Sequence, residues 1–565
     1  MKQICYLFLY LNIYTCLFFE ISAQEIQLSI TAEKPLSEGL LDSIQFQNKF
    51  DDYLSLNREA NEISDRFHRL GYTESELQLL KKNNDSSYTA QYLLGKRFSE
   101  IKIYYSQENF SQKELASVSA FITDTYFILP FETIESSLQK LNSSKTENGN
   151  AFASLRLSNI SVEEDHTLSA FLILDLGSKR TIDSIAIKGY EKFPISYLKY
   201  FAGIKKGKIF SQKKLIKQNE AINSLPFVST LKPPEALFRK DSTLVYFYLK
   251  KRNANSFDGV LGFATNEKTN KLQLNGYLNL ELNNNLNFGE QFLLTYKADG
   301  EEQRNFRVNV KLPYLLKSPF GVGLELVLFK RDSTFITSEQ QARITYQINP
   351  SSVSYVGYKG YESSNLLDDL IAGTPIEDYK SKFVLIGASY TKLQNSFLFP
   401  IKSEIGLDAE IGSRDRKETT DEQVKIKSIV NYIFNLNYKN SIFLQNNTAT
   451  LLSDNFLINE LYRFGGINSI RGFDENSIDA SFYSVLNTEY RYQFNEGLYV
   501  HSIIDIGYFE NKTLGIKEKL YGYGIGLGLQ TKPGLLKINI ANGNLENQTF
   551  KFSNTKIHLI LSTRF

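Results

Sequence analysis

Residues 271–283 read Lys271-Leu-Gln-Leu-Asn-Gly-Tyr-Leu-Asn-Leu-Glu-Leu-Asn283. Leucine or glycine occupies every even-numbered position, and polar residues occupy almost every odd-numbered one. Because side chains alternate between the two faces of a strand, this pattern predicts a strand with one apolar and one polar face. So long a strand with two such faces is expected where lipid lies on one side and water on the other.

The same alternation recurs through the chain after Arg252, for example at 303–313, 402–413 and 555–565. We count about sixteen such strands, and bacterial single-chain barrels have an even number of antiparallel strands. Residues 253–565 therefore predict a 16-stranded antiparallel transmembrane β-barrel. Its first and last strands are expected near 257–266 and 555–565.

The connections between these strands alternate in length, which indicates an orientation. The longer ones all follow odd-numbered strands, at 362–380, 414–423, 454–480, 510–518 and 543–554. Outer-membrane barrels have long external loops and short periplasmic turns. This agreement predicts that the barrel lies in the bacterial outer membrane with the N-terminal half in the periplasm.

The N-terminal half mixes strand and helix patterns in a weak repeat of about 75 residues. We expect three α+β repeats, at 25–96, 97–178 and 179–252. The third predicts the order β-α-α-β-β, with strands at 181–189, 227–228 and 243–249 and helices at 196–202 and 211–225. The second predicts helices at 113–122 and 131–141. Three unrelated α+β segments are the alternative.

Residues 1–23 have the pattern of a secretory signal peptide. Lys2 precedes an apolar run, and Ser22-Ala23 offers small residues for cleavage. A membrane anchor and a lipoprotein site at Cys16 are the alternatives. Both cysteines, Cys5 and Cys16, lie in this segment, so the mature chain is expected to have no disulfide and no thiolate metal site.

Bulk properties argue against several function classes. A formal net charge of +2 argues against a nucleic-acid surface. The four histidines are far apart, and none belongs to a metal-binding motif. We therefore expect no metal, no cofactor and no enzymatic activity.

The segment Arg463-Phe-Gly-Gly-Ile-Asn-Ser-Ile-Arg-Gly-Phe473 falls between the eleventh and twelfth predicted strands. Taken alone, it indicates a flexible glycine-rich turn. The alternation in strands 481–493 and 498–509 turns Glu489, Asp505 and Gly507 toward the barrel interior. From parity alone, these two carboxylates could form an acid/base pair.

Periplasmic β-α-α-β-β repeats followed by a sixteen-stranded barrel resemble the outer-membrane protein assembly family of BamA and TamA, whose repeats are called POTRA domains. Ile470-Arg471-Gly472-Phe473, which follows Gly465-Gly466, looks like the family's loop signature. Asp505-Ile506-Gly507 matches its aspartate-x-glycine element, whereas Ile503 stands where the family often has an aromatic residue. The resemblance implies that the loop folds into the lumen and that Arg471 pairs first with Asp505 and second with Glu489.

The resemblance also implies that Phe565 is a C-terminal signal read by assembly machinery, although completing the lower aromatic girdle is an equal explanation. On a late strand, Gly522, Gly524, Gly526 and Gly528 leave one face bare. Such a face suits a weak strand or the close approach of a luminal plug.

The expected function is the insertion or export of proteins at the outer membrane. Clients would bind by β-augmentation on the repeats and be templated at the barrel seam. The expected partners are unfolded outer-membrane or secreted proteins and membrane lipids, with accessory lipoproteins and periplasmic chaperones as further candidates. A dedicated two-partner-type secretion transporter and a passive porin-like channel are the alternatives.

Overall fold

The computed structural model describes residues 25–163, 167–265, 272–298, 303–332, 334–367, 376–531, 534–546, 548 and 551–563. The predicted signal peptide and Phe565 therefore lie outside the described residues. The chain divides into two compact units. The first ends at Arg180 and also includes Ile209–Gln212, whereas the second comprises Thr181–Lys208 and the chain from Lys213 onward. Among the described residues, no helix is both long and apolar enough to cross a membrane.

The N-terminal half contains three α/β repeats with one strand arrangement in common. In each, the first strand pairs parallel with the last, and the last pairs antiparallel with the strand before it. The sheet orders are β2-β1-β4-β3, β6-β7-β5-β9-β8 and β10-β12-β11. This shared pattern supports a true repeat, while the exact repeat boundaries stay a prediction.

The elements of the three repeats have the following bounds. The first repeat contains β1 (Ile26–Ala32), α2 (Glu38–Ile44), β2 (Lys49–Phe50), α3 (Tyr53–Arg69), β3 (Glu76–Asn84) and β4 (Ser87–Leu93). The second contains β5 (Glu100–Tyr104), α4 (Gln112–Leu115), β6 (Phe121–Ile122), β7 (Tyr126–Pro130), η1 (Phe131–Thr133), α5 (Ile134–Glu147), β8 (Ser154–Val162) and β9 (Leu168–Asp175). The third contains β10 (Ser184–Lys188), η2 (Tyr197–Phe201), α6 (Gln212–Asn223), β11 (Val228–Phe238) and β12 (Thr243–Lys251).

Each of the first two repeats has its own apolar core between helix and sheet. In the first, Leu56, Ala60, Ile63 and Phe67 recur along α3 at helical spacing and are fully buried. Asp52 caps this helix, because its carboxylate accepts the backbone N–H of Ser55 at 2.8 Å. In the second, the predicted helix over 113–122 is wrong: only Gln112–Leu115 is helical, and β6 and β7 follow. The short α4 ends early because Phe121 and Ile122 pair with β7.

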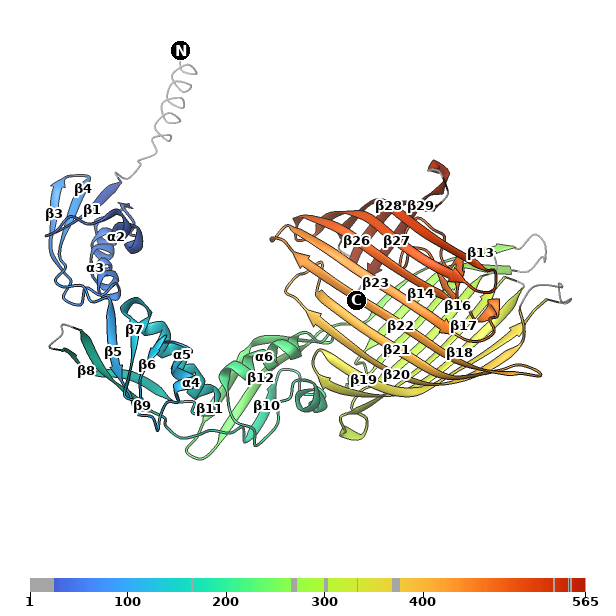
Figure 1. The fold of residues 1–565 in the computed structure, drawn as a ribbon, viewed down its shortest axis with the longest axis horizontal. Helices are drawn as coiled ribbons and strands as arrows, with labels where there is room; N and C mark the ends of the chain where they lie inside the picture. The colour runs from blue at the N-terminus through green and yellow to red at the C-terminus, as the bar shows by residue number, and fades with distance from the viewer. Residues whose placement is uncertain are drawn as a thin grey trace, which may run out of the picture. The chain divides into compact units, whose positions relative to one another are not determined.

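The C-terminal half forms a 16-stranded antiparallel sheet that curls into a barrel (Figure 1). Every neighbouring pair of strands in chain order is hydrogen-bonded except that β26 follows β23, because β24 and β25 form a separate hairpin. The strands are β13 (Ser256–Thr265), β14 (Leu272–Asn283), β15 (Gln291–Ala298), β16 (Arg304–Leu312), β17 (Phe320–Arg331), β18 (Phe335–Asn349), β19 (Ser352–Asn365), β20 (Tyr379–Leu393), β21 (Ile401–Asp415), β22 (Thr420–Asn435), β23 (Asn440–Leu452), β26 (Phe482–Asn495), β27 (Leu498–Asn511), β28 (Ile516–Gln530), β29 (Gly534–Leu545) and β30 (Thr555–Thr563). Short turns η3 (Leu315–Lys317) and η5 (Phe552–Asn554) lie in connections.

The faces of these strands follow the predicted alternation. On β21, Leu407 and Ile411 are 52% and 55% exposed, whereas Glu410 between them is 2% exposed. An apolar surface that large on one side and buried charge on the other is typical of a barrel wall in lipid. Two predicted loops are much shorter than expected, since β21 and β22 are separated by 416–419 and β27 and β28 by 512–515. Polar residues at these ends continue the strand ladders.

The third repeat packs on short turns of the barrel within the second unit. The Tyr190 hydroxyl donates to Asn287, and the Tyr197 hydroxyl donates to the Gly289 carbonyl at 3.0 Å. Gly289 has φ +80°, and a Cβ there would lie 2.1 Å from the Tyr197 ring. Tyr197 also meets Tyr314 edge to face, with ring centroids 4.9 Å apart. These contacts join the repeat to the β14–β15 and β16–β17 turns.

Candidate functional site in the barrel lumen

The long connection between β23 and β26 is a folded hairpin. It contains η4 (Ile458–Glu460), and its two strands β24 (Tyr462–Phe464) and β25 (Ile478–Ala480) pair antiparallel, with Phe464 opposite Ile478. The ring of Phe464 stacks on Tyr483 of β26 with centroids 4.5 Å apart. The predicted segment 463–473 therefore begins in β24 and ends in the tip of this hairpin, which we call the luminal loop (453–481).

Three glycines allow the tip to turn. Gly465, Gly466 and Gly472 have φ values of +118°, +88° and +92°, which L side chains rarely adopt. A Cβ at Gly465 would lie 2.5 Å from the Asp474 carbonyl oxygen, and one at Gly466 would lie 2.2 Å from the Glu475 carboxylate. Backbone conformation favours glycine at all three positions, and the Asp474 carbonyl also leaves no room for a side chain at Gly465, so the segment is not a loose turn.

Arg471 is at the centre of the site and is 4% exposed. Its Nε donates to Asp505 Oδ2 at 2.8 Å and its Nη2 donates to Asp505 Oδ1 at 2.5 Å. Its backbone N–H also donates to Asp505 Oδ2, at 2.9 Å. Nη1 donates to Glu489 Oε1. The guanidinium therefore makes a bidentate pair with Asp505 and a second ion pair with Glu489, the geometry that arginine suits better than lysine.

Glu489 lies between two arginines on the inner wall. Its Oε2 accepts Arg491 Nε at 2.7 Å, while His501 Nε2 lies 3.9 Å from Oε1. The Arg491 guanidinium in turn lies over the rings of Phe443 and Phe399, at 4.1 and 4.5 Å from their centroids. Each ionised group buried here is thus paired, as a low-dielectric site demands.

Glycines on the wall make room for the loop backbone. A Cβ at Gly522 of β28 would lie 2.3 Å from the Arg471 carbonyl oxygen, and a Cβ at Gly507 would lie 3.1 Å from Ile470 Cδ1. On β29, a Cβ at Gly543 would lie 2.5 Å from the Gly472 carbonyl oxygen. The bare face of β28 is therefore partly filled by the loop. Gly526 and Gly528 of β28 instead receive His501 and Tyr499 of the neighbouring strand β27.

Apolar packing seals the tip. Ile470 is fully buried among residues of the loop, β26, β27 and β28: Phe464, Ala480, Val485, Phe509 and Leu520. Ile503, the departure from the family pattern, is 1% exposed. The Asn487 side chain donates to the Ser469 carbonyl at 2.7 Å. The loop is thus held by packing and hydrogen bonds as well as by charge.

A second charged cluster, which the sequence analysis missed, holds the base of the loop. Arg414 of β21 is fully buried and pairs with Glu460 of the loop and, at 2.5 Å, with Asp421 of β22. Asp479 of β25 pairs with Arg331 of β17 at 2.5 Å. The parity of Arg414 on its strand predicts an inward side chain, but no local pattern indicates a partner so distant in sequence.

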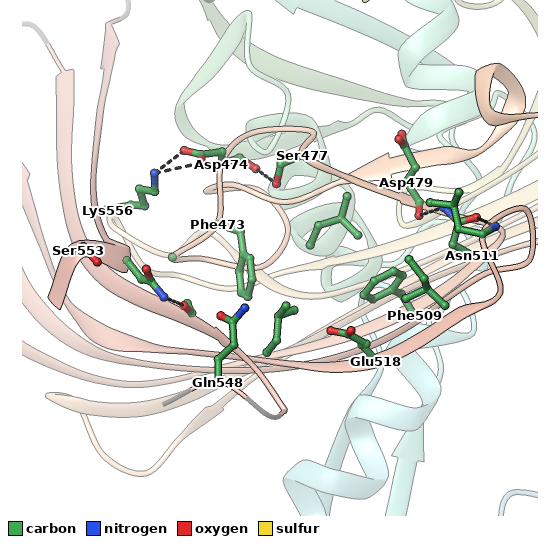
Figure 2. Close-up of a pocket in the computed structure, with 17 residues that line it drawn as sticks. Phe473, Asp474, Ser477, Asp479, Phe509, Asn511, Glu518, Gln548, Ser553 and Lys556 are labelled. Carbon is green, nitrogen blue, oxygen red and sulfur yellow. Dashed lines mark hydrogen bonds and ion pairs between the residues drawn. The ribbon is translucent and has the colours of Figure 1, made fainter. Parts of the chain in front are cut away.

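Phe473 and the end of the loop line a cavity of about 530 Å³ against β27, β28, β29 and β30 (Figure 2). Lys556 of β30 pairs with Asp474 at 2.8 Å, and Asn511 donates to the Asp479 carbonyl. The loop tip is thereby linked to the last strand of the sheet.

The hydrogen bonds of Arg471 hold the luminal loop against the barrel wall. Glu489 and Asp505 both accept hydrogen bonds from the same guanidinium, which suits a structural ion-pair network better than an acid/base pair. Among the described residues, no group of three histidine, cysteine, aspartate or glutamate side chains could hold a metal ion. The ion pairs of Arg471 join the luminal loop to β26 and β27.

Residues 284–565, from the end of β14 to the C-terminus, match the Omp85 superfamily domain. The chain belongs to the Omp85 superfamily. It is therefore a bacterial outer-membrane protein of an assembly and transport family, consistent with its barrel and repeats. No curated protein matches the sequence.

Three solved structures share the fold of this Omp85 chain. BamA from Haemophilus ducreyi lacking POTRA domains 1–3 is 16% identical with a TM-score of 0.50, covering 83% of this chain and 100% of that one. CdiB from Acinetobacter baumannii is 14% identical with a TM-score of 0.50 and covers 96% and 89%. CdiB from Escherichia coli is 15% identical with a TM-score of 0.50 and covers 94% and 100%. At these identities the likeness is one of fold.

Proposed function

We propose that this protein inserts or exports proteins at the outer membrane, without enzymatic chemistry, and that its repeats lie in the periplasm. Clients bind first to free strand edges of the repeats and are then templated at the seam of the barrel. The partners are unfolded outer-membrane or secreted proteins in a lipid bilayer. Accessory lipoproteins and periplasmic chaperones would deliver them.

The observation that carries this proposal is the seam. β13 and β30 are the two ends of the sixteen-stranded sheet, and within 256–265 and 555–563 no backbone pairing joins one to the other. An unpaired strand edge is a template for another strand. Placed in the membrane, such an edge supports the pairing of a client strand by backbone hydrogen bonds, which do not depend on client sequence.

The luminal loop supports the seam from inside. Asp474 pairs with Lys556 on β30, and Gly472 lies against the backbone of Asn542 and Gly543 on β29. The loop tip thus contacts the last two strands, while Arg471 anchors it to β26 and β27. We propose that the Arg471 contacts hold the last strands in the position that receives clients.

The edge strands of the third repeat differ in how well they could pair with a client strand. β11 is interrupted by Pro233 and Pro234, which lack N–H donors, and its register shifts beside them. β10 (Ser184–Lys188) pairs only with β12, so its other edge is open among the described residues. We therefore propose β10 as the edge of the third repeat that receives an extended client segment.

The alternatives differ in what they require. A passive porin needs neither repeats nor a luminal loop linked to its last strands. A dedicated secretion transporter shares both features, so it stays the closer alternative. Conductance of the purified protein, with and without residues 25–252, separates the porin, because a large steady pore in both forms would favour it.

Site-specific cross-linking tests the proposal directly. Cys5 and Cys16 are replaced, and single cysteines are placed at Ser184 on β10 and Ser256 on β13. Matched controls are Ser229→Cys on the proline-interrupted β11 and Ser354→Cys on the lipid-facing side of β19. We expect cysteine-bearing clients to cross-link at Ser184 and Ser256 several times more than at the controls. Equal labelling at all four positions would contradict the proposal.

Depletion of the protein separates its possible scopes. A fall in all outer-membrane barrels indicates a general assembly factor, and loss of one or a few proteins indicates a specialised factor or a dedicated secretion transporter. Unchanged abundance of every barrel and every secreted protein would refute assembly and export together.

A further inference from the structure

A second cavity, of about 780 Å³, lies inside the barrel between the wall strands β14–β22 and the base of the luminal loop. It is separate from the Arg471 site and is lined mostly by polar and charged side chains. Which carboxylates and cations of the lining already have partners decides what kind of ligand the cavity can bind.

The carboxylates that border the cavity are engaged by other donors. Glu325 accepts Arg307 and Asn309, and Glu339 pairs with Lys359 at 2.8 Å. Glu460 pairs with Arg414, and Asp408 accepts the Tyr355 hydroxyl. The remaining carboxylate, Glu281, accepts hydrogen bonds from the side-chain amides of Asn283 and Gln291 at 2.9 and 2.7 Å.

Four cations of the same cavity form no ion pair in the part of the chain that the structure describes: Lys311, Arg343, Lys425 and Lys427. Arg343 and Lys311 lie on one hydrogen-bonded row of the wall, with Gly323 of β17 between them. A Cβ at Gly323 would come within 2.9 Å of Arg343 Nε, so the bare wall there is covered by this arginine.

Lys425 and Lys427 form the sharpest part of the cavity. They are two residues apart on β22 and both line the lumen, which places their Cα atoms about 7 Å apart. Lys425 is 3% exposed, and its ammonium lies 4.0 Å from the centroid of the Tyr361 ring. Lys427 lies 5.0 Å from the centroid of Tyr462 on β24. An aromatic face attracts an ammonium but accepts no conventional hydrogen bond, so the donors of both lysines stay available.

Glu410 and Asp408 on β21 stand opposite Lys425 and Lys427, but Glu410 accepts hydrogen bonds from Lys359 and Tyr361, and Asp408 accepts one from Tyr355. Neither lysine forms an ion pair with them, so an oxyanion would supply charge-assisted hydrogen bonds that these partly buried ammonium groups lack. We propose that this cavity binds an oxyanion, a phosphoryl or sulfate group, between Lys425 and Lys427, with Arg343 and Lys311 extending the site along the wall. The group belongs either to a free ion or to a small phosphorylated molecule. A cavity of this volume accommodates both sources.

The bound anion would also stabilise the luminal loop. Tyr462, over which Lys427 lies, belongs to β24 of the loop, and Arg463 beside it also lines the cavity. An anion on Lys427 therefore sits where the wall meets the loop base, and it adds stability in proportion to its occupancy.

The test is titration of the purified full-length protein in detergent with inorganic phosphate, sulfate and glucose 1-phosphate, by calorimetry and by the thermal unfolding midpoint. We expect saturable binding and a rise in the midpoint. Lys425→Gln and Lys427→Gln are each expected to weaken binding about tenfold or more, since each removes charge-assisted hydrogen bonds. Lys425→Arg, which keeps the charge, should retain binding within about threefold.

Lys439→Gln is the matched control, because Lys439 also lies over a tyrosine ring but in a turn outside this cavity. Heat-modifiable migration of each variant on a gel verifies a folded barrel. If Lys425→Gln fails to fold, Lys427→Gln still tests the proposal, because Lys427 is only half-buried. Binding by glucose 1-phosphate as tight as that of phosphate identifies the phosphoryl group as the recognised part. The proposal is overturned if the unaltered protein shows no saturable binding, or if both glutamine variants bind as tightly as the unaltered protein does.

Discussion

Replacing Arg471 by alanine should release the luminal loop from the wall while leaving the sixteen-stranded sheet intact. Arg471 donates two side-chain hydrogen bonds to Asp505, which is 1% exposed, and one to Glu489. After the change, Asp505 keeps only the backbone N–H of residue 471, whereas Glu489 keeps Arg491. Asp505 is therefore the group left buried without a counter-ion.

The magnitude follows from that unpaired carboxylate. Removing one partner of a buried ion pair costs about 3–5 kcal/mol, even where the intact pair itself contributes little net stability. This cost should appear as loop release, because β24 and β25 form no ladder with the wall strands and the wall can keep its hydrogen bonds. Once the loop leaves, water reaches Asp505 and limits the loss.

A cysteine at Ser469 reports the position of the loop, in a chain whose Cys5 and Cys16 are replaced. We expect maleimide labelling of Ser469→Cys to rise by about two powers of ten or more in the Arg471→Ala background, which corresponds to about 3 kcal/mol or more of lost loop stability. Insertion of the barrel should persist and client assembly should fall. Adding Asp505→Asn removes the buried charge and should recover more than half of the loss in loop stability.

Lys519→Ala is the control, because its pair with Glu546 is about half exposed and solvent-screened and should contribute little to stability. Arg471→Lys should fall between alanine and the unaltered protein, since it keeps the charge but loses the bidentate geometry. Unchanged labelling and normal client assembly in Arg471→Ala would refute this reasoning.

Three further predictions concern other contacts. Gly472→Ala should displace the loop at a cost of more than about 1 kcal/mol, because a Cβ would lie 2.5 Å from the backbone of Asn542 and Gly543. Gly515→Ala is the control for backbone conformation, because Gly515 also has a positive φ, +69° against +92°, but has open space around it. Equal effects of the two variants in chemical denaturation would contradict the clash. Tyr197→Ala should cost about 3–5 kcal/mol, because it removes the ring contact with Tyr314 and Gly289. Tyr197→Phe removes only the hydrogen bond to Gly289 and should cost about 1 kcal/mol. Protease cleavage within residues 284–289 measures both losses, and similar cleavage in the two variants would argue against the ring contact. Hydrogen bonds from the backbone and side chain of Ser55 lower the pKa of Asp52 below 3.8. The stability that ionised Asp52 gives the first repeat is therefore present above pH 3.8 and lost as the pH falls further. Asp52→Ala should lower the unfolding midpoint of residues 25–180 at neutral pH but not near pH 2, and an equal effect at both pH values would exclude the ionised cap.

The sequence by itself determined the number, positions and faces of the barrel strands, because lipid on one side and water on the other impose a strict two-residue period on every strand. The same parity placed Glu489 and Asp505 on the inner wall. Sequence periodicity failed at residues 113–122, where a helical pattern is overridden by the pairing of Phe121 and Ile122 with β7. It also failed at the polar ends of β21, β22, β27 and β28, which extend as strands without an amphipathic pattern.

Only the tertiary structure decided which inward groups meet. Arg414 and Glu460 are 46 residues apart, and Arg331 and Asp479 are 148 apart, so no local pattern can pair them. The clearance at Gly522 and Gly543 depends on where the luminal loop returns inside the barrel wall. The same return sets the cavity in which Lys425 and Lys427 form no ion pair with a described residue. Periodicity assigns a side chain to a face, whereas its partner is set by the packing of strands and loop in three dimensions.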